Sequence, residues 1–344
     1  MRVGMLTGGG DCPGLNAVIR AIVRKGERIH GDELIGFRDA WDGVRERRTM
    51  PLTIESMRGS LPRGGTVLGT KRGSPFDTPT GVEEVKASLA DLGLDALVVI
   101  GGNGSLTVAC RLFEQERLPI VGVPKTIDND IVGTDVTFGF NTAVQIATDA
   151  IDRLHTTAES HDRVMVVEVM GRHSGWIAAH AGIAGGATVV LIPEIPFDIE
   201  DVCRRISRRH ERGRFASIVV VAEGAEPVPG TLEVAEKVLD TFGHVRLGGV
   251  ADVIAREIGA RTGFETRVVM LGHVQRGGTP TAFDRVLSTR FGVAAIDLVH
   301  EHGWGQMVVA RGSDIVPAPL ALMVGKSRPV DMSLYRDVAE VFSA

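Results

Sequence analysis

Two aspartates, a lysine and a threonine lie within residues 124–130, directly after the apolar run 120–123. The run predicts a buried parallel strand, and the polar segment is then the loop at the carboxyl end of that strand, where α/β sheets meet ligands. In the pair Asp128 and Asp130, one carboxylate can accept a proton from a hydroxyl nucleophile while the other holds Mg²⁺. Taken alone, the pair could equally cap the segment that follows it, as aspartates in turns commonly do.

Two glycine-rich turns accompany the acidic segment: Gly-Gly-Gly-Asp at residues 8–11 and Gly-Gly-Asn-Gly-Ser at residues 101–105. Each turn follows an apolar run and opens a helical pattern, so each presents free backbone N–H groups and the positive end of a helix dipole to an anion. Neither turn fits the GxGxxG pattern of dinucleotide-binding folds, and neither continues to the GK[ST] of a P-loop. Amides for phosphate, with carboxylates for metal and proton transfer, favour phosphoryl transfer.

Basic residues border several of the other apolar runs: Arg163, Arg172, Arg267, His273 and Arg276. The planar fork of arginine suits phosphate, and several such residues at strand ends indicate a sugar-phosphate pocket. A single arginine is more often a surface ion-pair partner. The turn 272–278 is more specific, because an apolar strand delivers His273 and Arg276 into another glycine turn. Glu223 ends the run 217–222 and would accept sugar hydroxyls or form an ion pair.

A sheet is needed to position these motifs. Apolar runs predict strands at residues 1–6, 96–100, 120–123, 164–169, 189–192, 217–222 and 268–271. Helical spacing of apolar residues lies between them, at residues 143–154, 199–212, 250–258 and 281–300. Two strand–glycine turn–helix units followed by a further strand indicate a wound sheet. We therefore expect an α/β protein with two wound lobes and mainly parallel sheets.

Length, net charge and cysteine content exclude several classes of protein. A chain of 344 residues is long enough for two domains, and its net charge of −5 argues against general nucleic-acid or anionic-membrane binding. Cys12, Cys110 and Cys203 are far apart and lack CxxC spacing, which predicts free thiols in a reducing compartment. No apolar run reaches the roughly 18 residues of a membrane span, and the N-terminus has no signal-peptide pattern. We expect a cytoplasmic protein.

Residues 8–14, 124–130, 170–172 and 272–278 resemble the motifs of bacterial 6-phosphofructokinases, in the order and at the spacing of that family. The resemblance covers nearly the whole chain and is to the actinobacterial type, which includes ATP-dependent and pyrophosphate-dependent enzymes. It implies glycolytic phosphorylation of fructose 6-phosphate at its C1 hydroxyl by Mg·ATP, giving fructose 1,6-bisphosphate and ADP. A reversible pyrophosphate-dependent enzyme and a non-catalytic sugar-phosphate sensor remain as alternatives.

The resemblance also implies how the chain is organised. Residues 1–139 plus about 276–325 would form a phosphoryl-donor-binding lobe. Residues 140–275 plus the C-terminal tail would form a fructose 6-phosphate-binding lobe. Arg163 and Arg267 would reach into the site of a neighbouring subunit, which implies a homotetramer with shared active sites.

The resemblance implies a role for each residue that matches a family motif. Asp128 would be the base that activates the C1 hydroxyl, and Thr126 and Arg172 would steady the transferring phosphoryl group. The metal would be held by Asn103 and Asp130. The phosphoryl donor would contact Gly10, Arg72, Gly102, Asn103, Gly104 and Ser105. The sugar phosphate would contact Thr126, Asp128, Arg163, Met170, Gly171, Arg172, Glu223, Arg267, His273 and Arg276.

Three positions near the predicted donor site distinguish this chain from its relatives. Asn103 stands where relatives carry an acidic metal ligand, and since an amide oxygen brings no charge, we expect weaker metal binding. Gly104 leaves room for the α-phosphate region of a nucleotide, whereas pyrophosphate-using relatives place an aspartate there. Lys125 resembles the pyrophosphate users, although some actinobacterial ATP users share it. We let position 104 decide, and expect ATP to be the donor.

Overall fold

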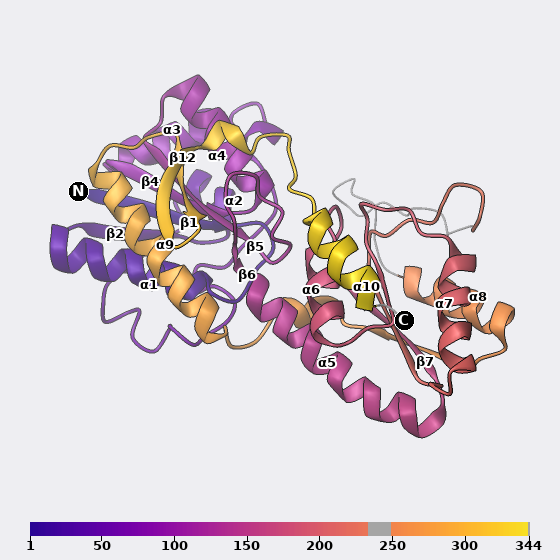
Figure 1. Ribbon diagram of the computed structural model, residues 1–344. Coiled ribbons are helices and arrows are strands. Elements are labelled where there is room, and N and C mark those ends of the chain that lie inside the picture. The colour runs from indigo at the N-terminus through magenta and orange to yellow at the C-terminus, as the bar shows by residue number, and fades with distance from the viewer. Residues whose placement is uncertain (233–248, 343–344) are drawn as a thin grey trace. The chain divides into compact units, whose positions relative to one another are not determined.

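The structure, a computed structural model, describes residues 1–232 and 249–342 (Figure 1). The chain divides into two compact units. Unit 1 consists of Met1–Thr142 and Arg276–Ser327, and unit 2 consists of Ala143–Gln275 and Arg328–Ala344. Each unit has its own sheet.

Unit 1 is built on an eight-stranded sheet of order β12-β11-β5-β4-β1-β2-β3, with β6 paired to the end of β5. The strands are β1 (Arg2–Gly8), β2 (Glu33–Phe37), β3 (Thr49–Leu52), β4 (Ala96–Gly101), β5 (Ile120–Thr126), β6 (Phe138–Gly139), β11 (Gln306–Arg311) and β12 (Asp314–Pro319). The edge strands β3 and β12 are antiparallel to their neighbours, and the pairs between them are parallel. The central strands β1, β4 and β5 are almost wholly buried, as their continuous apolar runs predict.

The helices of unit 1 connect the strands and cover the sheet. They are α1 (Leu15–Lys25), a π-helical turn (Gly26–His30), α2 (Ala40–Arg45), α3 (Gly81–Asp91), α4 (Asn103–Glu116) and α9 (Ala282–His300), with 3-10 turns at Pro75–Asp77 and Leu320–Leu322. Helices α1 and α9 lie side by side (Figure 1). Gly292 makes their close approach possible, because a Cβ there would lie 2.5 Å from the carbonyl oxygen of Val18.

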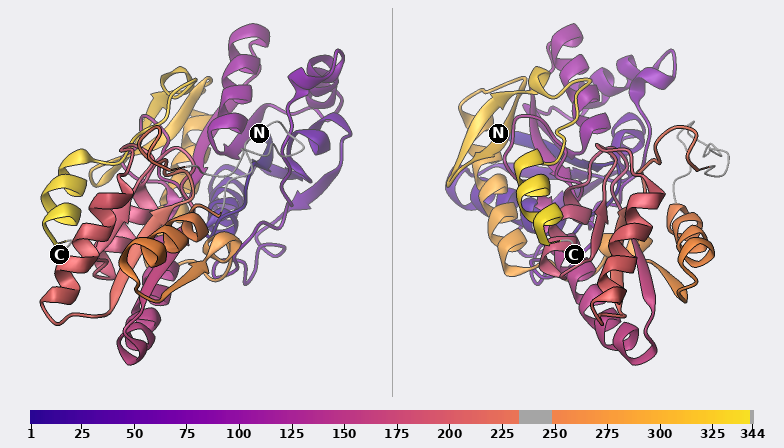
Figure 2. Two further views of the ribbon diagram at one scale, coloured as in Figure 1. Left: turned by 90° about the vertical axis from the view of Figure 1, so that its right-hand side faces the viewer. Right: turned by 45° about the vertical axis from the view of Figure 1, so that its right-hand side comes forward.

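Unit 2 is built on a parallel sheet of order β10-β7-β9-β8. Its strands are β7 (Val164–Val169), β8 (Val189–Leu191), β9 (Ser217–Ala222) and β10 (Thr266–Met270). Its helical elements are α5 (Phe140–His161, which begins in unit 1), α6 (Trp176–Ala184), α7 (Ile199–Glu211), α8 (Val250–Thr262), a 3-10 turn (Gly272–Arg276, whose last residue belongs to unit 1), a π-helical turn (Leu334–Ala339) and α10 (Glu340–Phe342). Helices α7 and α8 cover one face of the sheet, where their apolar residues join those of the strands in one core (Figure 2).

The expected fold class is confirmed, and β7 and β9 have the predicted bounds. One boundary was wrong in a way that concerns the site. Strand β5 continues to Thr126, so Pro124, Lys125 and Thr126 belong to the strand and not to the following loop. The physical reason is a pairing between distant residues: β6 pairs with the end of β5, Lys125 opposite Phe138 and Thr126 opposite Gly139.

Two further features of composition can be compared with the structure. Cys12, Cys110 and Cys203 are free and buried, as their spacing predicts. None of the helices in the described part of the chain combines the length and apolar character that crossing a bilayer requires.

Candidate functional site

The two glycine turns lie side by side in unit 1, because β1 and β4 are neighbours and their last residues, Gly8 and Gly101, are paired. The side chain of Ser105 lies over both glycines, so that a Cβ on either of them would overlap it. The residue before α4, Gly102, forms no side-chain cap, which leaves the first N–H groups of this helix to other acceptors. The two turns therefore form a cradle, in which the start of α4 supplies free backbone amides suited to phosphate.

Position 104 opens onto free space. A Cβ built on Gly104 would meet no atom within 4 Å, and the residue is exposed. Gly104 lies in the first turn of α4, beside the amides of the cradle. A nucleotide, which continues beyond its terminal phosphates, would therefore meet no steric obstacle at this residue.

Two cations lie against the first glycine turn. Lys125 is 4% exposed, and its ammonium group donates a hydrogen bond to the carbonyl oxygen of Gly10. Burial lowers the pKa of Lys125, because a desolvated ammonium group is costly to keep charged. The guanidinium group of Arg276 lies so close to Gly10 that a Cβ there would overlap it. Arg276, predicted to contact the sugar phosphate, thus lies beside the predicted donor cradle in unit 1.

The loop after β5 holds Asp128 partly exposed. The backbone N–H of Asp128 donates to Thr126 Oγ1 at 3.1 Å. Asn129 adopts a left-handed conformation (φ 53°), and its Oδ1 accepts from the N–H of Thr137 at 3.0 Å. The hydroxyl of Thr137 in turn donates to the carbonyl oxygen of Thr126 at 2.8 Å. Asn129 and Thr137 therefore fix this loop, a role that the asparagine between two aspartates signals but that we did not predict.

Asp130 is buried and lies beside Asn103. Its Oδ2 accepts from the amide nitrogen of Asn103 at 2.9 Å and lies 3.5 Å from the hydroxyl of Ser327. Burial, and then the nearby charge of Asp128, raise the pKa of Asp130 to about 6. The Oδ1 atoms of Asp130 and Asn103 are both buried and have no hydrogen-bond partner.

These two unpartnered oxygens fit a hard divalent cation. A carboxylate and an amide oxygen are typical magnesium ligands, and buried oxygens without partners are costly unless something binds them. Over residues 1–232 and 249–342, no group of three or more His, Cys, Asp or Glu side chains could hold a metal by itself. Magnesium seldom needs such a cage, because it is usually held by one or two carboxylates together with substrate phosphates and water.

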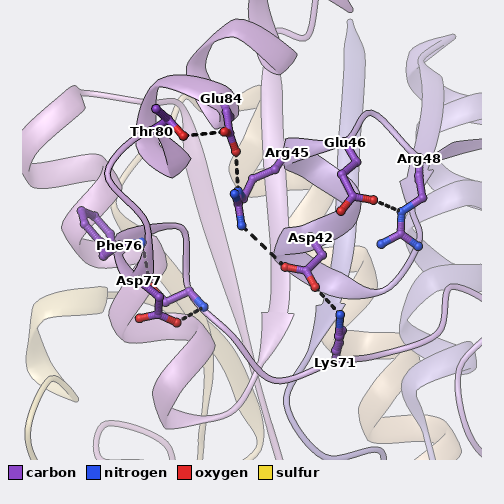
Figure 3. Close-up of polar contacts among 10 residues, drawn as sticks. Asp42, Arg45, Glu46, Arg48, Lys71, Phe76, Asp77, Thr80 and Glu84 are labelled. Carbon is purple, nitrogen blue, oxygen red and sulfur yellow. Dashed lines mark hydrogen bonds and ion pairs between the residues drawn. The ribbon is translucent and has the colours of Figure 1, made fainter. Parts of the chain in front are cut away.

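Arg72, predicted to contact the donor, is exposed. Polar contacts of the preceding residue, Lys71, hold this segment against α2 (Figure 3). Lys71 Nζ lies 2.5 Å from Asp42 Oδ2, and Asp42 also faces Arg45, which bonds a glutamate of α3. The N–H of Gly9 donates to the carbonyl oxygen of Lys71 at 3.3 Å. Exposed ion pairs contribute little free energy singly, but this network sets the course of the segment beside the first glycine turn.

In unit 2, the loop after β7 and the turn after β9 lie together. The N–H of Glu223 donates to the carbonyl oxygen of Val169 at 2.8 Å, and that of Gly224 to Gly171 at 3.1 Å. Gly171 has φ 144°, a conformation that favours glycine, and a Cβ on Gly224 would overlap the carbonyl oxygen of Arg172. Met170, Gly171, Arg172 and Glu223 are thus brought together at the carboxyl ends of two neighbouring strands.

A buried glutamine connects this loop to the turn that carries His273. Gln275 Oε1 accepts from the N–H of Met170 at 3.3 Å, and its Nε2 donates to the carbonyl oxygen of Gly272 at 3.1 Å. The side chain is fully buried, while His273 is exposed. We did not single out Gln275 from the sequence, although it lies inside the 272–278 motif.

Arg163 and Arg267 lie apart from these loops, at the amino ends of the neighbouring strands β7 and β10 in unit 2, and both bond the same glutamate. Arg163 Nη2 lies 2.9 Å from Glu265 Oε1, and Arg267 pairs with the same carboxylate. Arg267 is exposed and Arg163 is half-buried. Their contact with a neighbouring subunit stays a prediction.

Comparisons with known proteins address the family directly. Residues 2–299 match the family model described as "Phosphofructokinase". The chain is 58% identical over 342 residues to the Streptomyces coelicolor "Pyrophosphate--fructose 6-phosphate 1-phosphotransferase", covering 99% of this chain and 100% of the relative. It is 55% identical over 343 residues to the Mycobacterium tuberculosis "ATP-dependent 6-phosphofructokinase", covering 99% of this chain and 100% of the relative.

The fold is also similar to that of a solved phosphofructokinase structure. The phosphofructokinase of Pichia pastoris in the T-state aligns with a TM-score of 0.82 and 32% identity over 99% of this chain. This chain spans 36% of that longer yeast chain. The family resemblance inferred from the motifs is confirmed: the chain belongs to the phosphofructokinase family.

Proposed function

We propose that the protein transfers the γ-phosphoryl group of ATP to the C1 hydroxyl of fructose 6-phosphate, giving fructose 1,6-bisphosphate and ADP. One observation carries the proposal most directly: Asp128 is partly exposed in a fixed loop of the same sheet whose neighbouring strands form the amide cradle. Neighbouring parallel strands bring their carboxyl ends to one edge, so a base and a polyphosphate site share that edge. Relatives that match the whole chain carry names of this reaction type.

The residues divide the work as follows. Asp128 accepts the proton of the C1 hydroxyl as the sugar oxygen attacks the γ-phosphorus. The cradle amides, with Arg72, Gly102 and Ser105, hold the donor, and Thr126 and Arg172 steady the transferring group. When bound, magnesium supplies positive charge that offsets the charge of the phosphate oxygens, with Asp130 and Asn103 as its protein ligands.

ATP is the proposed donor because position 104 is open. Apart from the adjoining backbone of α4, no atom lies within 4 Å of a Cβ built on Gly104, so the α-phosphate region of a nucleotide would not be obstructed at this residue. A donor-swap assay tests this with purified protein, magnesium and fructose 6-phosphate. Turnover with ATP and little with pyrophosphate is expected, and the opposite result rejects ATP.

Pyrophosphate is the alternative donor, and two observations favour it. The buried Lys125 points at the first glycine turn, where its charge would meet a small, highly charged anion. The S. coelicolor relative at 58% identity is named for pyrophosphate. If pyrophosphate supports turnover, formation of fructose 6-phosphate from fructose 1,6-bisphosphate and phosphate is also expected, because that reaction is reversible.

For the acceptor we propose a site formed by the loops of unit 2, with the side chains of Met170, Arg172, Glu223 and His273. The contact of Arg276, a residue of unit 1, with the sugar phosphate stays a prediction. Arg163 and Arg267 would complete the site of a neighbouring subunit in a cytoplasmic homotetramer. Light scattering tests the assembly. Mixing an inactive Asp128→Asn protein with an inactive Arg163→Ala protein tests sharing, since hybrid tetramers regain activity only if subunits complement one another.

A further inference from the structure

Glu194 binds two segments of unit 2 that are far apart in the sequence. It lies after β8, and its two carboxylate oxygens each lie 3.0 Å from the backbone nitrogen of Gly175, which donates to them. Oε1 also accepts from the N–H of Val330 at 2.8 Å. One carboxylate thus satisfies a backbone donor at the start of α6 and another in the C-terminal segment.

The first of these segments is the end of the substrate loop, which we define as residues 170–175. Gly175 is the N-cap residue of α6 and provides no side-chain cap of its own. A Cβ at Gly175 would overlap Ile192 and would lie 3.0 Å from Glu194 Oε2. The carboxylate therefore fits against a bare backbone, at the helix end where negative charge is favoured.

The second is the C-terminal segment, residues 328–339, which docks on unit 2 through further contacts. The indole N–H of Trp176 donates to the carbonyl oxygen of Arg328 at 3.2 Å, and the Arg328 guanidinium lies 4.4 Å from the centre of the indole ring. The hydroxyl of Tyr335 donates to the carbonyl oxygen of Val190 at 2.8 Å. Val330 and Tyr335 are both buried.

The other end of the substrate loop is already anchored, because Gln275 accepts from the N–H of Met170. Without Glu194, the N–H of Gly175 would lose its acceptor and the loop would be held firmly at one end only. Loops that present ligand-binding side chains depend on such supports, since small displacements weaken binding.

We propose that Glu194 is a positioning residue for the substrate loop and that it makes the C-terminal segment a structural part of the sugar-phosphate site. This inference rests on the proposed function, in which Met170, Gly171 and Arg172 contact fructose 6-phosphate. Glu194 itself touches no substrate. Its effect is on how the loop is held.

The central experiment compares Glu194→Ala with wild type in the full-length protein. The KM for fructose 6-phosphate is expected to rise about tenfold, while the KM for the phosphoryl donor stays within about twofold. Glu194→Gln retains one carbonyl oxygen and is expected to give an intermediate KM. Hydrogen exchange read by mass spectrometry should show faster exchange in peptides covering residues 170–176 and 328–335.

Asp198→Ala is the matched control. Asp198 is also a carboxylate at a helix N-terminus of unit 2, where it accepts from the N–H of Glu200 at 2.9 Å, but it has no bond to the substrate loop. This variant should lose stability without changing the KM for fructose 6-phosphate. If Asp198→Ala raises that KM as much as Glu194→Ala does, the effect is one of general stability and the proposal is overturned.

Tyr335→Phe tests the C-terminal segment without altering Glu194. Removing the hydroxyl loosens the segment at Val190, and a rise of about threefold in the KM for fructose 6-phosphate is expected. A wild-type KM in this variant overturns the link between the segment and the site, and a wild-type KM in Glu194→Ala overturns the whole inference. If the wild-type protein does not phosphorylate fructose 6-phosphate, the proposed function fails, while hydrogen exchange still tests the anchor.

Discussion

Unit 1 and unit 2 both place most of their predicted site residues at the carboxyl ends of parallel strands, but they prepare those positions differently. Arg163 and Arg267 are exceptions, because they lie at the amino ends of β7 and β10. Unit 1 offers backbone amides at glycines where a side chain would overlap Ser105, beside buried Lys125 and Asp130. Unit 2 offers the side chains of loops, among which Arg172 is half-buried and His273 exposed. Those loops are held in place by other residues, Gln275 and Glu194, which bond their backbone N–H groups.

The difference follows from the ligands that we propose. A polyphosphate chain is dense in charge and has identical oxygens, so bare amides and a metal ion suit it. A sugar phosphate has hydroxyls of distinct direction, and these need side chains that reach them. Glycine turns are therefore a local signature of the first kind of site, whereas the second kind depends on contacts between distant loops.

The largest expected effect comes from removing the base in unit 1. Asp128→Asn preserves size but cannot accept the proton, so kcat is expected to fall by roughly 10²–10⁴-fold. Steady-state kinetics with the better donor, with substrate affinities measured separately by calorimetry, would check it. A rate near wild type removes Asp128 from the mechanism.

The second prediction concerns the buried charge that distinguishes unit 1. The pKa of Asp130 is raised from 3.8 to about 6, so the folded protein binds this proton more tightly than the unfolded chain does. The contribution of Asp130 to stability is then greatest below pH 3.8, falls as pH rises towards 6, and stays low above it. At neutral pH the deficit is at most ~3 kcal/mol.

Asp130→Asn removes that deficit. Without divalent cations, the thermal midpoint of this variant should exceed that of wild type by a few degrees at pH 8, and by less at pH 5. Glu223→Gln serves as the comparison in unit 2, where no such gain is expected. Equal differences at the two pH values would contradict the buried-charge account.

A pair of glycine substitutions separates the two sites. The methyl group of Gly8→Ala would push Ser105 away from the cradle, and that of Gly224→Ala would displace the backbone at Arg172. Overpacking costs about 1–3 kcal/mol, so a change of about tenfold in KM is expected in each variant. The KM for the donor should rise only in Gly8→Ala, and the KM for fructose 6-phosphate only in Gly224→Ala. Crossed or equal effects would show that the two sites are not separable in this way.

The smallest expected effect is a gain at the metal site of unit 1. Asn103→Asp adds a charged ligand beside Asp130 and should lower the magnesium concentration for half-maximal activity about fivefold. Binding of Mn²⁺ followed by electron paramagnetic resonance gives a readout independent of turnover. An unchanged magnesium requirement would show that the amide of Asn103 does not limit metal binding.

Much of this molecule follows from local patterns. The continuous apolar runs at β7 and β9 alternate with helical patterns along the chain. Such short apolar runs are typical of parallel strands that are buried on both faces, so their sequence alone predicts them. The end of β5 was misplaced because Lys125 and Thr126 pair with residues of β6, which the local pattern does not reveal. Long-range partners decide where such a strand ends.

The sequence by itself determined the family, the α/β class, the amide turns and the aspartates after β5, because backbone conformation and burial leave a local record in glycine spacing and apolar runs. The tertiary structure alone decided that Arg276 lies against Gly10, that Asn103 bonds Asp130, and that Gln275 and Glu194 hold the two ends of the substrate loop. These contacts join residues whose proximity depends on strand order and chain crossings. No local pattern encodes that order, so only the folded chain shows it.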